Sequence, residues 1–169
     1  TPYGLPTNYR GRTVRLNDQD LVLYSSEGPS YISKSEVKKG FDTIYKYKVM
    51  VSKTSAEHAG EPGRDGKFKV ITSSMRVLYP GEVCTHSYFV IGSFNNITEA
   101  KNLYGYLQSK FVRFLILQSM SSINLSKNVF TFVPAQDFTK PWTDEELYKK
   151  YNLDQEEIDF IESMIKPME

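Results

Sequence analysis

A polar stretch in the first half of the chain, residues 53–70 (KTSAEHAGEPGRDGKFKV), combines side-chain types that catalysis often uses. A serine, a histidine and several carboxylates lie within a few positions of one another. Ser55, Glu57 and His58 are too close in sequence to orient one another as a nucleophilic triad, so a triad would need partners from elsewhere in the fold. The chain also lacks a G-x-S-x-G nucleophile turn and a glycine-rich nucleotide loop.

Metal-dependent hydrolysis is the enzyme reaction closest to this pattern. Glu57 or Glu61, followed by Asp65-Gly66-Lys67, imitates the spacing with which many nucleases hold Mg²⁺ and activate water. Asp-Gly, however, is a strong turn signal, whereas metal-binding carboxylates need a rigid strand. With two histidines, one cysteine and no HExxH or CxxC spacing, the sequence indicates no zinc centre and no metal ligands. A Mg²⁺-dependent nuclease built on Glu57, Asp65 and Lys67 stays open as an alternative.

Positive charge is the dominant feature of the same region. Residues 46–76 hold seven Lys and Arg against three Asp and Glu, and their glycines let a backbone approach a partner closely. Cations on loop tips bind phosphates, and polar side chains read base edges in the major groove. A solvated hairpin tip explains the same composition equally well. If the region does bind DNA, the candidate contacts are Lys53, Ser55, Glu57, His58, Arg64, Lys67 and Lys69, followed by Asn8, Arg10 and Arg12.

Charge is unevenly distributed along the 169 residues. Residues 1–127 carry 17 Lys and Arg against 10 Asp and Glu, whereas residues 128–169 carry 4 against 10. A basic body suits a polyanionic partner, although ordinary solubility charge would look similar. The acidic tail would repel phosphates, so it is a candidate docking surface for a protein. A protein-interaction module is therefore the third functional class that the sequence leaves open.

Several protein classes receive no support from the composition. The single Cys84 lies in an apolar run, which excludes an internal disulfide and indicates a buried, inert thiol. Neither a membrane-length apolar run nor a signal peptide is present, so we expect a cytoplasmic protein with no membrane partner. Because the chain begins with Thr1 and not Met, we expect a piece of a larger protein.

Hydrophobic periodicity predicts an α+β fold, with a mixed sheet, one long packed helix and a C-terminal helical pair. We expect a hairpin from 13–16 and 21–24, a short helix from Ser35 to Tyr45, and a helix over 97–119 that begins at an Asn96/Glu99 capping box. Helices capped by Thr143 and Asp154 follow, the second running to Lys166. Further strands are expected at 31–33, 47–52, 68–72, 75–78, 84–91 and 129–133. Residues 1–136 form the expected core domain, and 137–169 an acidic helical appendix packed on it.

Four blocks of sequence resemble a known family. They are PYGLPTNYR at 2–10, SKTSAEHAGEP at 52–62, ITSSMRVLYPGEVCTHSYFVIG at 71–92, and the tail from VFTFVPAQDF to IESMI at 129–165. Together they are similar to the C-terminal specificity domain of bacterial type II restriction–modification adenine methyltransferases of the Eco57I type, with the TaqI methylase as a structural parallel. The resemblance covers nearly the whole chain, and the tail is its most specific part.

The resemblance implies a target-recognition domain that reads double-stranded DNA. In such enzymes the N-terminal methyltransferase domain of the same polypeptide binds S-adenosylmethionine and extrudes the target adenine. The catalytic tetrapeptide, Asn or Asp followed by Pro-Pro-aromatic, is absent, so this chain itself is expected to be non-catalytic and to need no cofactor. Base-reading residues differ between members, and none is transferred from the family to this chain.

Overall fold

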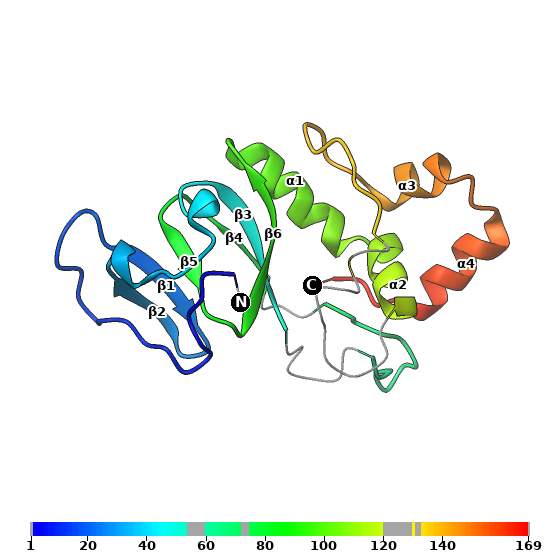
Figure 1. Ribbon diagram of the computed structural model, residues 1–169. Helices are drawn as coiled ribbons and strands as arrows, with labels where there is room; N and C mark the ends of the chain where they lie inside the picture. The colour runs from blue at the N-terminus through cyan, green and yellow to red at the C-terminus, as the bar shows by residue number, and fades with distance from the viewer. Residues whose placement is uncertain (1, 54–59, 72–74, 120–129, 131–132, 169) are drawn as a thin grey trace.

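Short strands and helices alternate along the chain in the computed structural model, which describes residues 2–53, 60–71, 75–119, 130 and 133–168 (Figure 1). The fold class is α+β, as the periodicity predicts. The described strands are β1 (Leu21–Ser25), β2 (Gly28–Ile32), β3 (Tyr47–Ser52), β4 (Arg76–Leu78), β5 (Glu82–Cys84) and β6 (Tyr88–Phe94). The described α-helices are α1 (Ile97–Gln108), α2 (Lys110–Ser119), α3 (Asp144–Lys150) and α4 (Gln155–Met164).

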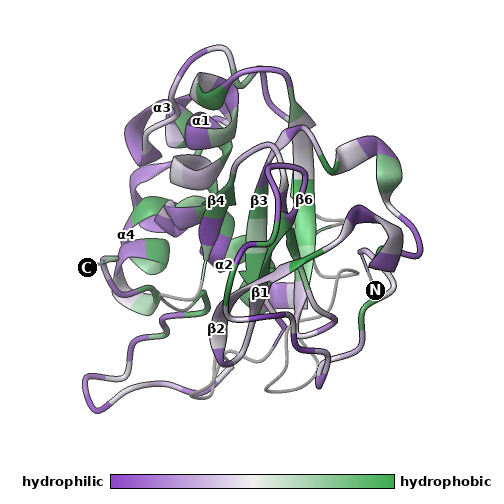
Figure 2. Cartoon of the chain, turned by 90° about the vertical axis from the view of Figure 1, so that its left-hand side faces the viewer, coloured by the Kyte–Doolittle hydropathy of each residue, from purple (hydrophilic) through white to green (hydrophobic). Residues whose placement is uncertain are grey.

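The strands form two separate three-stranded sheets instead of the single mixed sheet expected. The N-terminal sheet has the order β2-β1-β5, with β1 antiparallel to β2 and parallel to β5. The central sheet has the order β4-β3-β6 and is antiparallel throughout. Figure 2 shows the central strands between the helices on one side and the N-terminal segment on the other.

Both faces of the central sheet are buried, because alternate residues of β3 serve two hydrophobic clusters. Val49 and Val51 belong to the cluster that includes α1, α2, α3 and α4. Met50 points to the opposite cluster, which includes Leu23 and Val83 of the N-terminal sheet. The molecule therefore has three layers, with the N-terminal sheet, the central sheet and the helices stacked in that order (Figure 1).

The predicted long helix over 97–119 is wrong in one respect, because it breaks at Ser109. Ser109 has an extended conformation, with φ −60° and ψ 150°, and its hydroxyl accepts the N–H of Val112. The carboxylate of Asp144 accepts the N–H groups of Lys110 and Phe111 from across the fold. The apolar periodicity of the sequence continues through the break. The cap from Asp144 stabilises the start of α2 from a distant part of the chain, so it leaves no signal in the sequence around Ser109.

Three predictions around the N-terminal sheet are also corrected. Residues 13–16 are not a strand, because the buried carboxylate of Asp20 accepts the N–H groups of Leu16 and Asn17 and holds a loop. The hairpin partner of β1 is β2, across Ser26 and Glu27. The helix expected from Ser35 is replaced by two short 3-10 turns, Lys34–Glu36 and Phe41–Thr43, separated by a left-handed Gly40.

Later elements follow the predictions more closely. The strand expected at 84–91 is divided by a turn at residues 85–87, which separates β5 from β6. Residue 68 makes an isolated parallel bridge to Ile165 instead of starting a strand. Thr143 and Asp154 cap α3 and α4 as predicted, although α4 ends at Met164, before Lys166. The strand expected at 129–133 lies mostly outside the described residues. No helix in the described ranges is both long and apolar enough to cross a membrane.

Candidate functional site

One edge of the layered sheets gathers polar side chains from several distant segments. β1 and β5 run parallel, so their ends lie together, and β3 runs antiparallel to β4 and β6, so its end lies near their starts. Contacts of Arg76 with Tyr24 and of Tyr88 with Ser25 join these two groups of strand ends. Backbone contacts join these ends, since the N–H of Lys53 donates to the carbonyl of Ser87 at 2.9 Å. We call this surface the loop edge and define it by residues 24–27, 53, 75–76 and 85–88.

Lys53 and His86 make the closest polar contact on the loop edge. Lys53 follows β3, and His86 lies 33 residues later in the turn between β5 and β6, yet Lys53 Nζ is 2.9 Å from His86 Nδ1. Partial burial lowers the pKa of Lys53, and the nearby Lys39 lowers it further against an opposing effect of Cys84. Desolvation also lowers the pKa of His86, with Lys53 the next cause. Within the described residues, neither side chain is paired with a carboxylate.

A tyrosine-lined hollow lies at the same edge. Its volume is about 290 Å³, and it is lined by side chains from both sheets, including Tyr24, Met50, Arg76 and Tyr88. The guanidinium of Arg76 stacks over the ring of Tyr24, 4.8 Å from its centroid, and the hydroxyl of Tyr88 donates to the carbonyl of Ser25. Aromatic and guanidinium planes of this kind can contact the sugars and bases of a nucleic acid.

The basic segment from β3 to β4 leaves the loop edge and is held at its far end. Residues 63–67 form a tight turn, in which the N–H of Gly63 donates to the carbonyl of Lys67 and that of Gly66 to the carbonyl of Gly63. Arg64 and Lys69 are exposed and Lys67 is half-buried. None of the three cations forms an ion pair among the described residues, although Lys67 lies near the carboxylate of Glu162.

Two anchors join this segment to the helices. Phe68 donates its N–H to the carbonyl of Met164 and accepts the N–H of Lys166, each within 2.9 Å. The buried guanidinium of Arg113 donates to the carbonyls of Lys69 and Gln108. The helix α2 and the end of α4 therefore hold the backbone that presents the basic side chains.

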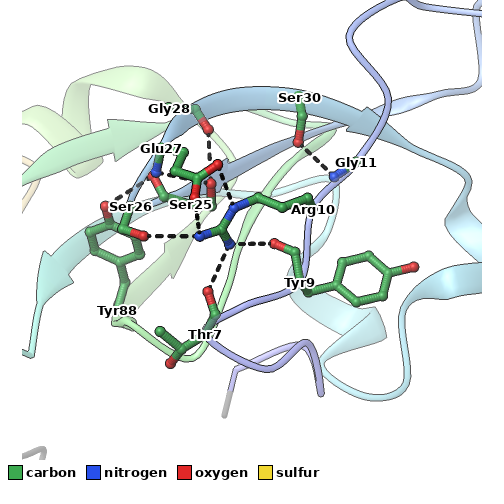
Figure 3. Close-up of polar contacts among 10 residues, drawn as sticks. All are labelled: Thr7, Tyr9, Arg10, Gly11, Ser25, Ser26, Glu27, Gly28, Ser30 and Tyr88. Atoms are coloured by element: carbon green, nitrogen blue, oxygen red, sulfur yellow. Dashed lines mark hydrogen bonds and ion pairs between the residues drawn. The ribbon is translucent and has the colours of Figure 1, made fainter.

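Two of the predicted N-terminal contacts have internal partners instead (Figure 3). The guanidinium of Arg10 donates to the carbonyls of Thr7 and Tyr9 and pairs with Glu27, its Nε lying 3.0 Å from a carboxylate oxygen. Arg12 pairs with the buried carboxylate of Asp20 at 2.7 Å. These arginines fasten the N-terminal segment to the N-terminal sheet, whereas Asn8 is exposed.

The remaining predicted residues divide into two groups. Ser55, Glu57 and His58 lie outside the described residues. Asp65 lies in the tight turn, where its carboxylate accepts the N–H of Lys67 and contacts Lys166 at 3.6 Å. The backbone bond from Lys67 is the main cause that lowers the Asp65 pKa. Asp65 and Lys67 are thus parts of a turn and not of the strand that the nuclease alternative needs. No group of three His, Cys, Asp or Glu side chains in the described ranges is placed to hold a metal ion.

Sequence reasoning missed His86, Arg76, Tyr24 and Tyr88 as members of the site. His86 has no local motif, and only the pairing of β3 with β6 brings it to Lys53. Arg76 and Tyr24 belong to different sheets and come together only in the layered fold. Alternation along a strand does not reveal which strands meet, and His86 lies in a turn, where no alternation applies.

Comparison with known proteins does not identify a family for this chain. No protein-family model, no curated protein and no solved structure matches the chain.

Proposed function

We propose that the chain recognises double-stranded DNA, as the specificity domain of a site-specific N6-adenine methyltransferase in a bacterial restriction–modification system. The observation that carries the proposal is the group of cations on the loop edge and on the segment that leaves it, none of which forms an ion pair with a carboxylate among the described residues. Lys53 and Arg76 come from different places in the sequence, and Arg64, Lys67 and Lys69 lie on the segment that leaves the loop edge.

The arrangement suits a duplex for physical reasons. Phosphates require positive side chains that are free of internal ion pairs, and sequence readout requires a polar element that can enter a groove. The segment at 60–71 supplies exposed cations on a backbone fixed at its far end by Arg113 and the end of α4. Fixing the backbone lowers the entropy lost on binding.

The acidic helices have a different proposed partner. Their carboxylates would repel phosphates, so we assign this surface to the N-terminal methyltransferase domain of the same polypeptide. That domain would bind S-adenosylmethionine and carry out the chemistry, and the present chain would supply only recognition.

The proposal is tested by duplex binding over a salt series, starting from a random-sequence pool at low salt. We expect the combined change Lys53→Ala, Arg64→Ala and Lys67→Ala to weaken binding and to reduce the salt slope by about 2 to 3, because each lost phosphate contact reduces the slope by about 0.9. The control removes the same charge from exposed lysines on the helical side, with Lys101→Ala, Lys140→Ala and Lys149→Ala.

The outcomes separate the functional classes. Binding that the loop-edge changes weaken and the helical-side changes leave intact supports DNA recognition. Equal effects of both triple variants would indicate nonspecific attraction and would contradict the proposal. Mg²⁺-dependent cleavage that Asp65→Ala abolishes would favour the nuclease alternative. Absence of duplex binding at low salt, both by this chain and by the full-length protein, would also overturn DNA recognition.

A further inference from the structure

The contact between Lys53 and His86 is unusual because both groups can carry positive charge. A protonated lysine can only donate, so the ring nitrogen 2.9 Å away must be the unprotonated one. Lys53 Nζ also lies 3.4 Å from His86 Nε2, so Nδ1 is the nearer acceptor of a neutral imidazole. In most proteins a lysine placed this close to a polar partner faces a carboxylate or a carbonyl.

The backbone fixes both residues before any ligand arrives. Lys53 donates its N–H to Ser87, and His86 donates its N–H to Leu5, which is itself buried in the second hydrophobic cluster. Thr85, next to His86, is completely buried. The pair is thus a preformed feature of the turn between β5 and β6.

Positive charge around the pair and open space beside Lys53 favour an anion. A hollow of about 440 Å³ is lined by Lys53 together with Val90 and Gly92 of β6 and with Gly40 and Thr43, and His86 lies outside this lining. This volume exceeds what a single phosphate needs. Lys39 is close enough to lower the pKa of both Lys53 and His86. Among the described residues, the charged groups that face His86 are therefore the cations Lys53 and Lys39.

We propose that Lys53 and His86 form a phosphate-binding subsite, in which a phosphate oxygen accepts hydrogen bonds from both side chains and Lys39 supplies further positive charge. One part of this inference rests on the proposed function, namely that the phosphate belongs to the DNA backbone. A bound oxygen replaces the imidazole as the acceptor for Lys53. The imidazole then takes up a proton from solvent at Nδ1 and donates as well, so duplex binding is coupled to protonation of His86.

Proton uptake gives the subsite a specific signature. The imidazole of the free protein has a lowered pKa, and an adjacent phosphate raises it by about one unit. Linkage then requires duplex affinity to fall about tenfold as the pH rises from below the pKa of the free imidazole to above the pKa of the bound one. A purely structural contact would leave the affinity independent of pH in this range.

The test follows the His86 ring by NMR, with His86→Gln identifying its resonance among the two histidines of the chain. The imidazole pKa is measured in chloride, in inorganic phosphate of equal ionic strength, and with saturating duplex. We expect both phosphate sources to raise it by about one unit and Lys53→Met to abolish both shifts. His86→Gln should remove the pH dependence of duplex affinity. Lys140→Met is the matched control, since Lys140 pairs with Glu146 on the helical side.

Each outcome bears separately on the subsite and on the proposed function. Duplex binding with an unchanged His86 pKa would overturn the subsite and leave DNA recognition standing. A shift in inorganic phosphate without duplex binding would support a phosphate subsite and contradict the proposed source. No shift in phosphate and no duplex binding would overturn both. A shift that persists in Lys53→Met would show that the lysine is not part of the subsite.

Discussion

The loop edge and the helical side use positive charge in opposite ways. On the helical side, Lys110 pairs with Glu162 and Lys140 with Glu146, so these cations are matched within the fold. On the loop edge, Lys53 faces a histidine and Arg76 faces a tyrosine ring, with no described carboxylate partner. Exposed ion pairs contribute little stability, whereas unmatched cations remain available to an anion.

The difference shows that a count of basic residues is a poor guide to function. Arg10 and Arg12 are as basic as Lys53, but both pair with carboxylates inside the N-terminal layer. The useful distinction is whether the fold supplies a counter-charge. Cations that the fold buries and cations that it exposes should therefore respond differently to substitution.

The largest expected effect concerns two arginines with opposite environments. Arg113 is buried and bonds to two carbonyls, and burial lowers its pKa to about 10 even though Asp144 opposes the shift. Arg113→Ala should lower the free energy of unfolding by about 3 kcal/mol, because it opens a cavity and leaves buried carbonyls without donors. Chemical denaturation measures this change.

Arg76→Ala is the matched comparison on the loop edge. Its guanidinium is exposed over Tyr24, so the variant should lose less than about 1 kcal/mol of stability while binding duplex more weakly. Arg113→Met retains side-chain volume and should fall between wild type and Arg113→Ala. If Arg76→Ala destabilised the fold as much as Arg113→Ala, the distinction between structural and available cations would fail.

Two lysines, Lys48 in β3 and Lys53 directly after it, give the second test. Lys48 is fully buried and donates to the carbonyl of Ile44 at 2.9 Å, and desolvation lowers its pKa to about 8. The unfolded lysine keeps a pKa near 10.4, so between about pH 8 and 10 the unfolded state binds more protons than the folded state. The contribution of Lys48 to the free energy of unfolding therefore increases with pH across this window, because the cost of burying its charge disappears.

The measurement compares wild type with Lys48→Met in denaturation experiments from pH 7 to pH 10. Relative to the variant, wild type should gain roughly 2 kcal/mol between pH 8 and 10. The difference between the two unfolding free energies is needed because the raised pKa values of Cys84 and Tyr3 lower the stability of both proteins as the pH increases. Lys53→Met serves as the control and should show a much smaller change, since Lys53 is only partly buried. A constant difference between wild type and Lys48→Met would refute the buried-charge explanation.

Local signals in the sequence were sufficient for much of the fold but for only part of the site. The apolar run at 47–52 predicted β3, and cap residues predicted the starts of α1, α3 and α4, because these signals act over a few residues. The break at Ser109 depends on Asp144, 34 residues beyond Lys110, and could not be read locally. Lys53 was predicted from its loop, whereas His86 joins it only through strand pairing.

The smallest expected effect lies in the cap of α4. Asp154 accepts the N–H of Glu157 at 2.8 Å, and Glu157 accepts the N–H of Asp154 in return. Asp154→Ala should cost about 1 kcal/mol of unfolding free energy, and Asp154→Asn should retain most of the stability because asparagine also accepts the bond.

Since α4 ends at the bridge to Phe68, fraying that reaches this end would also increase amide exchange at Phe68 and Lys166. Exchange measured by NMR in both variants would show whether the acidic helix holds the basic segment, and unchanged protection at Phe68 in Asp154→Ala would limit the effect of the cap to the first turn of α4.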